Sequence, residues 1–253
     1  MVNSMEGFDR IEVRSVVDTL LSPSLREQCF IGTYRRVVAN ISTLQDLKSA
    51  KHFQAISMLA RSLFELAVDI RLLDALPSGP LKMIEFVDVE KLRCARKALE
   101  FKAEHPDAKI DTASYSEFAA KNASRIDTTR ALLWPNLKQL SHWSGMKLPA
   151  RIKLLKSPFD EIYALHYPSL SWQVHAGLTG IVNLRAETFT LMCGQGFKLA
   201  VDSYWEVLSA MIHEFKLERA NEKIKGKMKA AKLLPFTDTP EQANEILRTL
   251  TGS

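Results

Sequence analysis

The spacing of apolar residues along the chain predicts helices almost throughout. Between the prolines, apolar residues recur every three to four positions, as on one face of a helix, and the strict alternation of a half-buried strand is missing. Proline and glycine clusters mark the ends of these segments because proline cannot continue a helix interior. We therefore predict an all-α protein, a single helical bundle with long central and C-terminal helices and short helices in the middle.

The breaks between the apolar segments give the expected helix bounds. Ser22-Pro23 has the form of an N-cap followed by proline at the first helical position. The proline-rich middle is expected to hold only short helices, one of which, in "WPNLKQLSHWSG", ends at Gly145. Residues 1–233 are expected to form the bundle domain and residues 234–253 a tail with a short helix. The expected helices cover residues 8–21, 23–44, 50–76, 80–102 and 186–232. The last of these contains no proline, and a bend is expected at Gly194 and Gly196.

The expected helix at residues 50–76 is apolar around most of its circumference and carries one narrow polar stripe. The stripe consists of Ser57, Arg61, Glu65 and Asp69. These residues lie four apart and therefore share one helix face, on which Arg61 and Glu65 can pair at i,i+4. Because a buried charge is costly unless it is paired, the stripe is either an internal ion pair of the bundle or a polar seam that faces a cleft.

A second polar set occurs in "YPSLSWQVHAG". Tyr167, Ser171 and His175 are also four residues apart and share one helix face, whereas His166 would lie on the opposite face from His175. The two histidines are therefore not expected to bind one metal ion. The sequence has no HExxH, P-loop, G-x-G-x-x-G or G-x-S-x-G motif, which argues against zinc hydrolases, kinases, dinucleotide oxidoreductases and α/β-hydrolases. We expect neither a metal nor a cofactor.

Charge is concentrated near the C-terminus. The segment from Lys216 to Lys232 has seven basic and two acidic residues, a net charge of +5 that equals the formal net charge of the chain. Its lysines could attract phosphates by releasing counterions, and equally could be a solvated helix end that complements the helix dipole. The candidate phosphate-binding residues are Lys223, Lys225, Lys227 and Lys229.

Composition is that of an ordinary globular protein, with 46% hydrophobic and 25% charged residues among 253. The three cysteines lie far apart without a C-x-x-C pair, which suits a reducing compartment. No leader pattern and no run of about 18 apolar residues occurs. These features predict a cytoplasmic protein without a membrane partner.

Three motifs follow one another along the chain: "MLARSLFELAVDIRLL", "SHWSG" and "SPFDEIYALHYPSLSWQVHAG". Together they resemble an uncharacterised bacterial family of unknown function with an Arg-x-x-x-Glu helix, a His-Trp-x-Gly segment and a Tyr-rich Ser-x-x-x-His helix. The resemblance covers about residues 45–215 and implies an all-helical fold without an established activity. The motif positions fall on Arg61, Glu65, His142, Trp143, Gly145, Tyr163, Tyr167, Ser171 and His175.

The chain also resembles, more distantly, the HEPN helical domains, many of which are metal-independent ribonucleases of toxin and defence systems. In that class an arginine precedes a histidine by four to six residues, a spacing that none of the six histidines here has. The resemblance implies RNA or a nucleotide as the substrate class.

Two functional hypotheses follow. In the first, the chain is a binding or regulatory module: Arg61, Glu65, His142 and His175 form a structural network, and a protein, RNA or a nucleotide is the partner, with Trp143, Tyr163, Tyr167 and the lysines as further binding residues. In the second, it is a metal-independent ribonuclease or nucleotide-processing enzyme. His175 would then move a proton, Arg61 would stabilise phosphate charge, Glu65 would orient either residue, and Ser171 or Tyr167 would bond a phosphate oxygen. A homodimer is compatible with both hypotheses.

Overall fold

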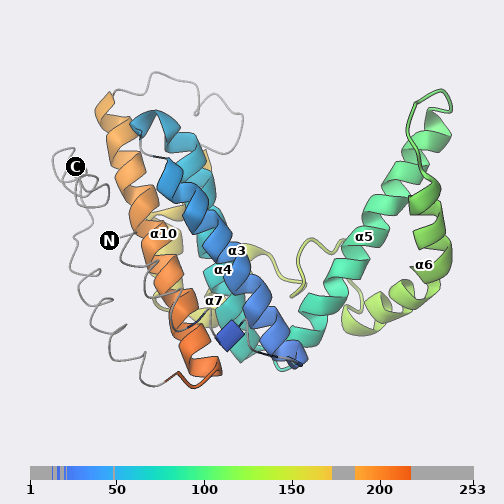
Figure 1. The fold of residues 1–253 in the computed structure, drawn as a ribbon, viewed down its shortest axis with the longest axis horizontal. Helices are drawn as coiled ribbons and strands as arrows, with labels where there is room; N and C mark the ends of the chain where they lie inside the picture. The colour runs from blue at the N-terminus through green and yellow to red at the C-terminus, as the bar shows by residue number, and fades with distance from the viewer. Residues whose placement is uncertain are drawn as a thin grey trace. The chain divides into compact units, whose positions relative to one another are not determined.

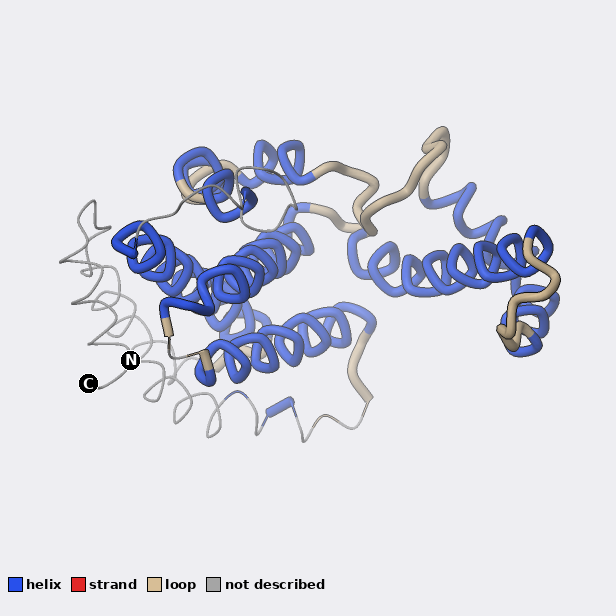
Figure 2. Tube along the Cα trace, turned by 90° about the horizontal axis from the view of Figure 1, so that it is seen from above, coloured by secondary structure: helices blue, strands red, loops and turns tan. Residues whose placement is uncertain are grey.

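Every regular element that the structure describes is helical, which confirms the predicted all-α class (Figures 1 and 2). The computed structural model describes residues 13, 16, 17, 20, 22–47, 49–172 and 186–217. Within these residues no helix is both long enough and apolar enough to cross a bilayer. The elements are α3 (Leu25–Asp46), the 3₁₀ turn η2 (Ala50–His52), α4 (Phe53–Ala75), α5 (Gly79–Glu104), α6 (Ala113–Leu133), α7 (Leu148–Leu155), α8 (Phe159–Leu165), α9 (Tyr167–Trp172) and α10 (Ala186–Glu214).

The helices group into two compact units. Unit 1 takes the described parts of residues 1–75 and 151–253, with α3, α4, α8, α9 and α10. Unit 2 takes residues 76–150, with α5 and α6, and α7 begins in unit 2 and ends in unit 1. This grouping adds to the predicted organisation, whose boundary at residue 233 lies outside the described residues.

The core of unit 1 is built around α4, which lies beside α3 and α10 (Figure 1). The apolar circumference seen in its sequence is buried nearly all round, and Ile56, Leu63 and Ile70 have no exposed surface. At the contact with α10, a Cβ atom on Gly196 would lie 2.8 Å from Cγ2 of Ile56. Gly196 therefore allows the two helices to approach closely, and α10 runs without interruption through it.

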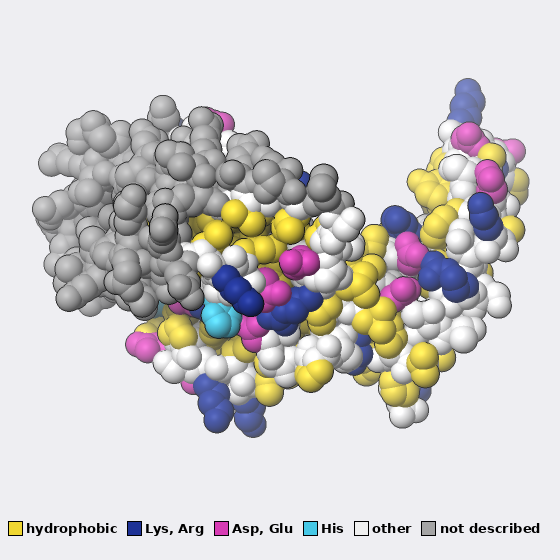
Figure 3. All heavy atoms as spheres, turned by 60° about the horizontal axis from the view of Figure 1, so that its bottom comes forward, with side chains coloured by type: hydrophobic (Ala, Val, Ile, Leu, Met, Phe, Trp, Pro, Cys, Tyr) yellow, Lys and Arg dark blue, Asp and Glu magenta, His cyan; other side chains and the backbone are white. Residues whose placement is uncertain are grey.

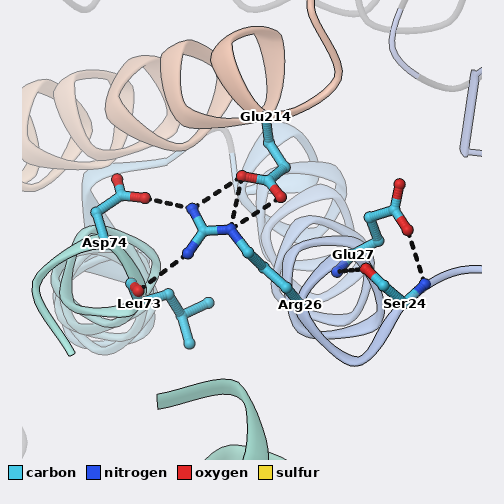
Figure 4. Close-up of polar contacts among 6 residues, drawn as sticks. All are labelled: Ser24, Arg26, Glu27, Leu73, Asp74 and Glu214. Atoms are coloured by element: carbon cyan, nitrogen blue, oxygen red, sulfur yellow. Dashed lines mark hydrogen bonds and ion pairs between the residues drawn. The ribbon is translucent and has the colours of Figure 1, made fainter. Parts of the chain in front are cut away.

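The N-terminus of α3 differs from the sequence prediction. The N-cap is Ser24 and not Ser22, and Pro23 precedes the cap. The Ser24 hydroxyl accepts a hydrogen bond from the Glu27 backbone N–H, and the Glu27 carboxylate accepts one from the Ser24 N–H (Figure 4). This reciprocal capping box satisfies two N–H groups that would otherwise lack partners, which outweighs the advantage of proline at the first helical position.

The C-terminus of α10 also differs from the sequence prediction. The helix was predicted to continue through residue 232, but it ends at Glu214. Lys216 has a φ of 53°, its N–H donates to the His213 carbonyl, and the Leu217 N–H donates to the Ile212 carbonyl. These two bonds form a Schellman motif, in which the left-handed residue is usually glycine. The predicted lysine-rich continuation, residues 218–232, lies outside the described residues.

The middle of the chain contains a longer helix than predicted. α6 is a single helix of 21 residues, because the first proline of this region after its start is Pro135, just beyond its end. The short helix predicted before Gly145 is absent: residues 134–147 form turns, and the Gly145 N–H bonds to the His142 carbonyl. Gly145 has a φ of 75°, and a Cβ there would come within 2.8 Å of Leu137.

Arg26 joins three helices at one end of unit 1 (Figure 4). Its Nε donates to both carboxylate oxygens of Glu214, the last residue of α10, at 2.9 Å, and its Nη2 contacts Asp74. Nη1 donates to the Leu73 carbonyl at 3.1 Å, one of the last four carbonyls of α4, which have no partner within the helix. The hydrogen bond to Glu214 raises the pKa of Arg26.

Unit 2 is an α5–α6 hairpin followed by the turns of residues 134–147. Figure 1 shows α5 and α6 joined by a loop at one end, and the two helices contact each other. The core of the hairpin is small: Val89, Leu92, Ile126 and Trp134 are buried, and half-buried apolar side chains surround them.

Candidate functional site

Three of the predicted site residues meet in unit 1. Arg61 and Glu65 come from α4 and form the predicted i,i+4 ion pair, with Nη2 and Oε1 3.5 Å apart. The phenol of Tyr167, from α9, lies between them: its oxygen accepts a hydrogen bond from Arg61 Nη2 at 2.8 Å and donates one to Glu65 Oε1 at 2.7 Å. This polar cluster of Arg61, Glu65 and Tyr167 fastens α9 to α4.

Packing holds the Tyr167 ring in place. The ring centroid lies 5.7 Å from that of Phe64 on α4 and 5.1 Å from that of Tyr163 on α8, and the Arg61 guanidinium carbon lies 4.8 Å from it. Burial, and then the hydrogen bond to Glu65, raise the pKa of Tyr167 to about 12. The phenol therefore keeps its proton near neutral pH and can donate to Glu65 while it accepts from Arg61.

The lower part of the α4 stripe pairs with a residue that the sequence analysis did not single out. Asp69 accepts a hydrogen bond from Arg151 Nη1 at 2.6 Å, and the two side chains are 15% and 6% exposed. Ser57, at the other end of the stripe, is fully buried. The stripe is therefore a largely internal seam of unit 1, and spacing alone does not reveal Arg151 because it lies 82 residues further along the chain.

His166 stands next to Tyr167, at the end of α8. Burial lowers its pKa, and the nearby positive charge of Lys198 lowers it further, while Asp202 and Glu161 act in the opposite direction. Lys198 and Asp202 form an i,i+4 ion pair on α10, with Nζ and Oδ2 2.8 Å apart. The neutral imidazole is thus favoured at this position.

His142 and Trp143 belong to unit 2, whereas Arg61 belongs to unit 1. Nδ1 of His142 is 2.8 Å from the Ser144 hydroxyl, and the Trp143 carbonyl accepts a hydrogen bond from the indole N–H of Trp134 at 2.7 Å. Trp134 and Trp143 are both 4% exposed. Their rings are packed inside the unit and do not form an open stacking surface.

Of the remaining predicted site residues, the structure describes Ser171 and Tyr163. Ser171 is half-buried on α9, one turn after Tyr167, and Tyr163 is half-buried on α8. His175, Lys223, Lys225, Lys227 and Lys229 lie outside the described residues.

Unit 2 contains a cavity of about 600 Å³ between α5, α6 and the turn segment that follows α6. Its floor is the outer side of the small core, formed by Val89, Leu92, Ile126 and Leu140. The rim carries five basic and three acidic residues, so that it has two more cations than anions. These are Arg93, Arg96, Lys97, Arg130 and Lys138, with Glu90, Glu100 and Asp127.

Only part of the positive charge at the rim is neutralised. Arg93 pairs with Glu90, and Arg96 pairs with Asp127, whose pKa is lowered chiefly by the hydrogen bond from Arg96. Arg130 instead donates from Nη2 to two backbone carbonyls, those of residues 137 and 138, at 2.9 and 3.1 Å. These acceptors are uncharged, so they do not offset the charge of Arg130, which also contributes to the lowered pKa of Asp127. Figure 3 shows basic and acidic side chains close together on the α5–α6 part of the molecule.

The residues of this cavity follow no sequence motif, so the cavity could not be predicted from the sequence. A local signal existed in the basic residues of α5, which recur at 93, 96 and 97, but their relation to Arg130 and Lys138 depends on how the hairpin folds. In the part of the chain that the structure describes, no group of three or more His, Cys, Asp or Glu side chains is arranged to hold a metal ion.

Comparison with known proteins gives one match. The model of a family of unknown function (DUF5677) matches residues 28–188, which include the polar cluster of unit 1 and all of unit 2. No curated protein and no solved structure matches the chain. The family match covers more than half of the sequence and confirms the resemblance inferred from the three motifs. The chain therefore belongs to the family of unknown function DUF5677.

Proposed function

We propose that this chain is a helical binding module that holds a phosphate-bearing ligand, a nucleotide or an RNA strand, in the cavity of unit 2. The observation that carries the proposal is the apolar floor beneath a rim with an excess of two cations. A base can cover apolar side chains while its phosphate meets the cations, a combination common in nucleotide and single-strand binding sites. The cavity volume is within the usual range of about 300–1,000 Å³ for small-molecule sites.

Three cations supply the positive charge that the ligand would neutralise. Lys97 and Lys138 are exposed on the rim, and Arg130 is bonded to neutral carbonyls. Arg130 is thereby held in a fixed orientation, so little side-chain entropy is lost when it binds a phosphate. The lysines reach the ligand as mobile point charges.

The polar cluster of unit 1 is, in this proposal, a structural element. Each of its three side chains has a partner within the cluster, and Tyr167 is buried. Such a network supports a fixed register between α4 and α9, because removing one member takes one partner away from each of the other two in a poorly solvated environment.

The test is equilibrium binding of fluorescent single-stranded RNA, with a nucleoside monophosphate and inorganic phosphate as competitors. A double variant, Lys97→Glu with Lys138→Glu, should weaken RNA binding by about tenfold or more and reduce the salt dependence, with a slope shallower by about 1.4 for two lost phosphate contacts. The control, Lys109→Glu with Lys121→Glu, changes the net charge of unit 2 equally at exposed positions that do not line the cavity. Competition by the monophosphate identifies a nucleotide site, and competition by neither small molecule identifies an RNA strand. Equal binding by the two double variants would refute the proposal.

The enzyme hypothesis is tested in the same samples. Arg61 is 17% exposed in its cluster, and its Nη2 is already hydrogen-bonded to Tyr167. Incubation of labelled RNA with and without EDTA, using wild type, Arg61→Ala and His175→Ala, separates the two functions. Cleavage that resists EDTA and is lost in both folded variants would establish a metal-independent ribonuclease. RNA that is bound and recovered intact supports the binding module.

A further inference from the structure

A second hollow in unit 2 has a different chemical character from the cationic cavity. It is a groove of about 630 Å³ between α5 and α6, and among the lining residues of the two hollows only Glu90 is shared. Val87 and Tyr115 in this groove are 50% and 40% exposed, although both are large apolar side chains. The groove is lined by Phe86, Val87, Glu90, Lys91, Cys94, Ala95, Ser114, Tyr115 and Phe118. Adjacent exposed apolar side chains of this kind mark protein contact sites.

We propose that this groove is the contact through which two copies of the chain associate. The charges at the groove support a second copy as the occupant. Glu90 and Lys91 are the charged residues that line it, one of each sign, and each is already paired within its own copy, with Arg93 and Asp88, so the groove offers a uniformly acidic or basic partner no net attraction. A second copy presents the same electrically balanced, apolar lining, and a two-fold axis brings the two grooves together without burying an unpaired charge.

The architecture of the hairpin supports the same occupant. Two antiparallel helices with an apolar groove between them can pack against an identical pair as a four-helix bundle, which buries both grooves at once. The hairpin has more to gain from such packing than unit 1, because α5 and α6 share only a small buried cluster, of which Val89, Leu92 and Ile126 come from the two helices. The proposal is independent of ligand binding in the cationic cavity.

The oligomeric state of the full chain is the first test, measured by sedimentation equilibrium over a wide concentration range. We expect a reversible dimer for the wild type. In Val87→Glu the dissociation constant of the dimer should be at least about tenfold higher, because the new carboxylate would be buried in the contact. Tyr115→Ser tests the α6 wall of the groove in the same way. Leu132→Glu is the matched control: Leu132 is 77% exposed on α6 and does not line the groove, so this variant should dimerise like the wild type.

Cys94 locates the contact. It is exposed in the groove, whereas Cys29 and Cys193 are buried, and burial raises the pKa of each of their thiols to about 11. A maleimide should therefore alkylate Cys94 selectively. In the wild type the reaction should be slower at protein concentrations where the dimer forms. In Val87→Glu the rate should be the same at low and high protein concentration. A chain that stays monomeric at every concentration would overturn the proposal. So would a dimer that survives both groove variants, or one in which Cys94 reacts as fast as in the monomer.

Discussion

The helices α4 and α6 have similar lengths, 23 and 21 residues, and very different environments. α4 buries eleven residues in unit 1, whereas α6 buries one, Ile126, in unit 2. Tertiary packing therefore stabilises α4 around most of its circumference, while α6 depends on the hairpin contact, its helix propensity and surface ion pairs. The comparison shows that the two units of one chain can differ in how strongly their helices are held, and that unit 2 has more surface left for binding.

The largest difference in stability loss between the two units is expected when one ion pair is broken in each. Arg151→Ala in unit 1 should lower the free energy of unfolding by about 3–5 kcal/mol, because it leaves the largely buried carboxylate of Asp69 without its cation. Arg96→Ala in unit 2 should cost at most about 1 kcal/mol, since the Arg96 and Asp127 side chains are 52% and 46% exposed. Urea unfolding followed by circular dichroism measures both. Similar losses would remove the distinction between the two units.

The next largest difference is expected when one buried leucine in the core of each unit is replaced by alanine. Leu63→Ala in α4 should cost about 2–5 kcal/mol of global stability, because Leu63 is fully buried and the cavity left behind cannot collapse completely. Leu92→Ala removes the same atoms at a site 2% exposed, beside a cavity already present. Its effect should be confined to unit 2. Hydrogen exchange would then show faster exchange in α5 and α6 with α4 and α10 unchanged, and loss of protection in α4 would contradict this expectation.

The polar cluster of unit 1 should show a smaller effect. Tyr167→Phe removes the hydroxyl between Arg61 and Glu65 and should cost about 1–3 kcal/mol, because two hydrogen bonds to charged groups are lost. Tyr163→Phe, the control on the neighbouring ring, should change stability by about 0.5 kcal/mol or less. Both values come from chemical unfolding at neutral pH. If the two variants are equally stable, the cluster does not fix α9 on α4.

The smallest effect concerns pH. Because the folded state lowers the pKa of His166 below 6.5, the unfolded chain takes up the proton first as the pH falls. The contribution of His166 to stability is therefore present above pH 6.5 and is lost as the pH falls from there to the pKa of the folded state. His166→Gln should show a smaller decrease than the wild type in this window. An identical pH dependence of the unfolding free energy in the two proteins would count against the shift.

Features that depend on local spacing could be predicted from the sequence, and features that depend on packing could not. The all-α class and the Arg61–Glu65 pair follow from helical periodicity, which is local. The N-cap at Ser24 was also accessible, since Ser-x-x-Glu is a known capping pattern. The end of α10 at Glu214 was not, because the residue in the left-handed conformation that follows it, Lys216, is not glycine.

The candidate sites divide in the same way. The partner of Arg61 and Glu65 is Tyr167, about a hundred residues away, and that of Asp69 is Arg151. Each partner is selected by how α9 or α7 packs on α4, and a single sequence does not encode this as a motif. The cationic cavity likewise combines residues of three segments that only the folded hairpin brings together.

The discontinuity of unit 1 sets the order in which the chain can fold during synthesis. α4 ends at residue 75, but α10, against which it packs, begins at residue 186, after the whole of unit 2 has been translated. The α5–α6 hairpin needs only neighbouring residues and can form as soon as it leaves the ribosome. The apolar faces of α4 must meanwhile remain incompletely covered, a period in which the nascent chain depends most on protection from aggregation.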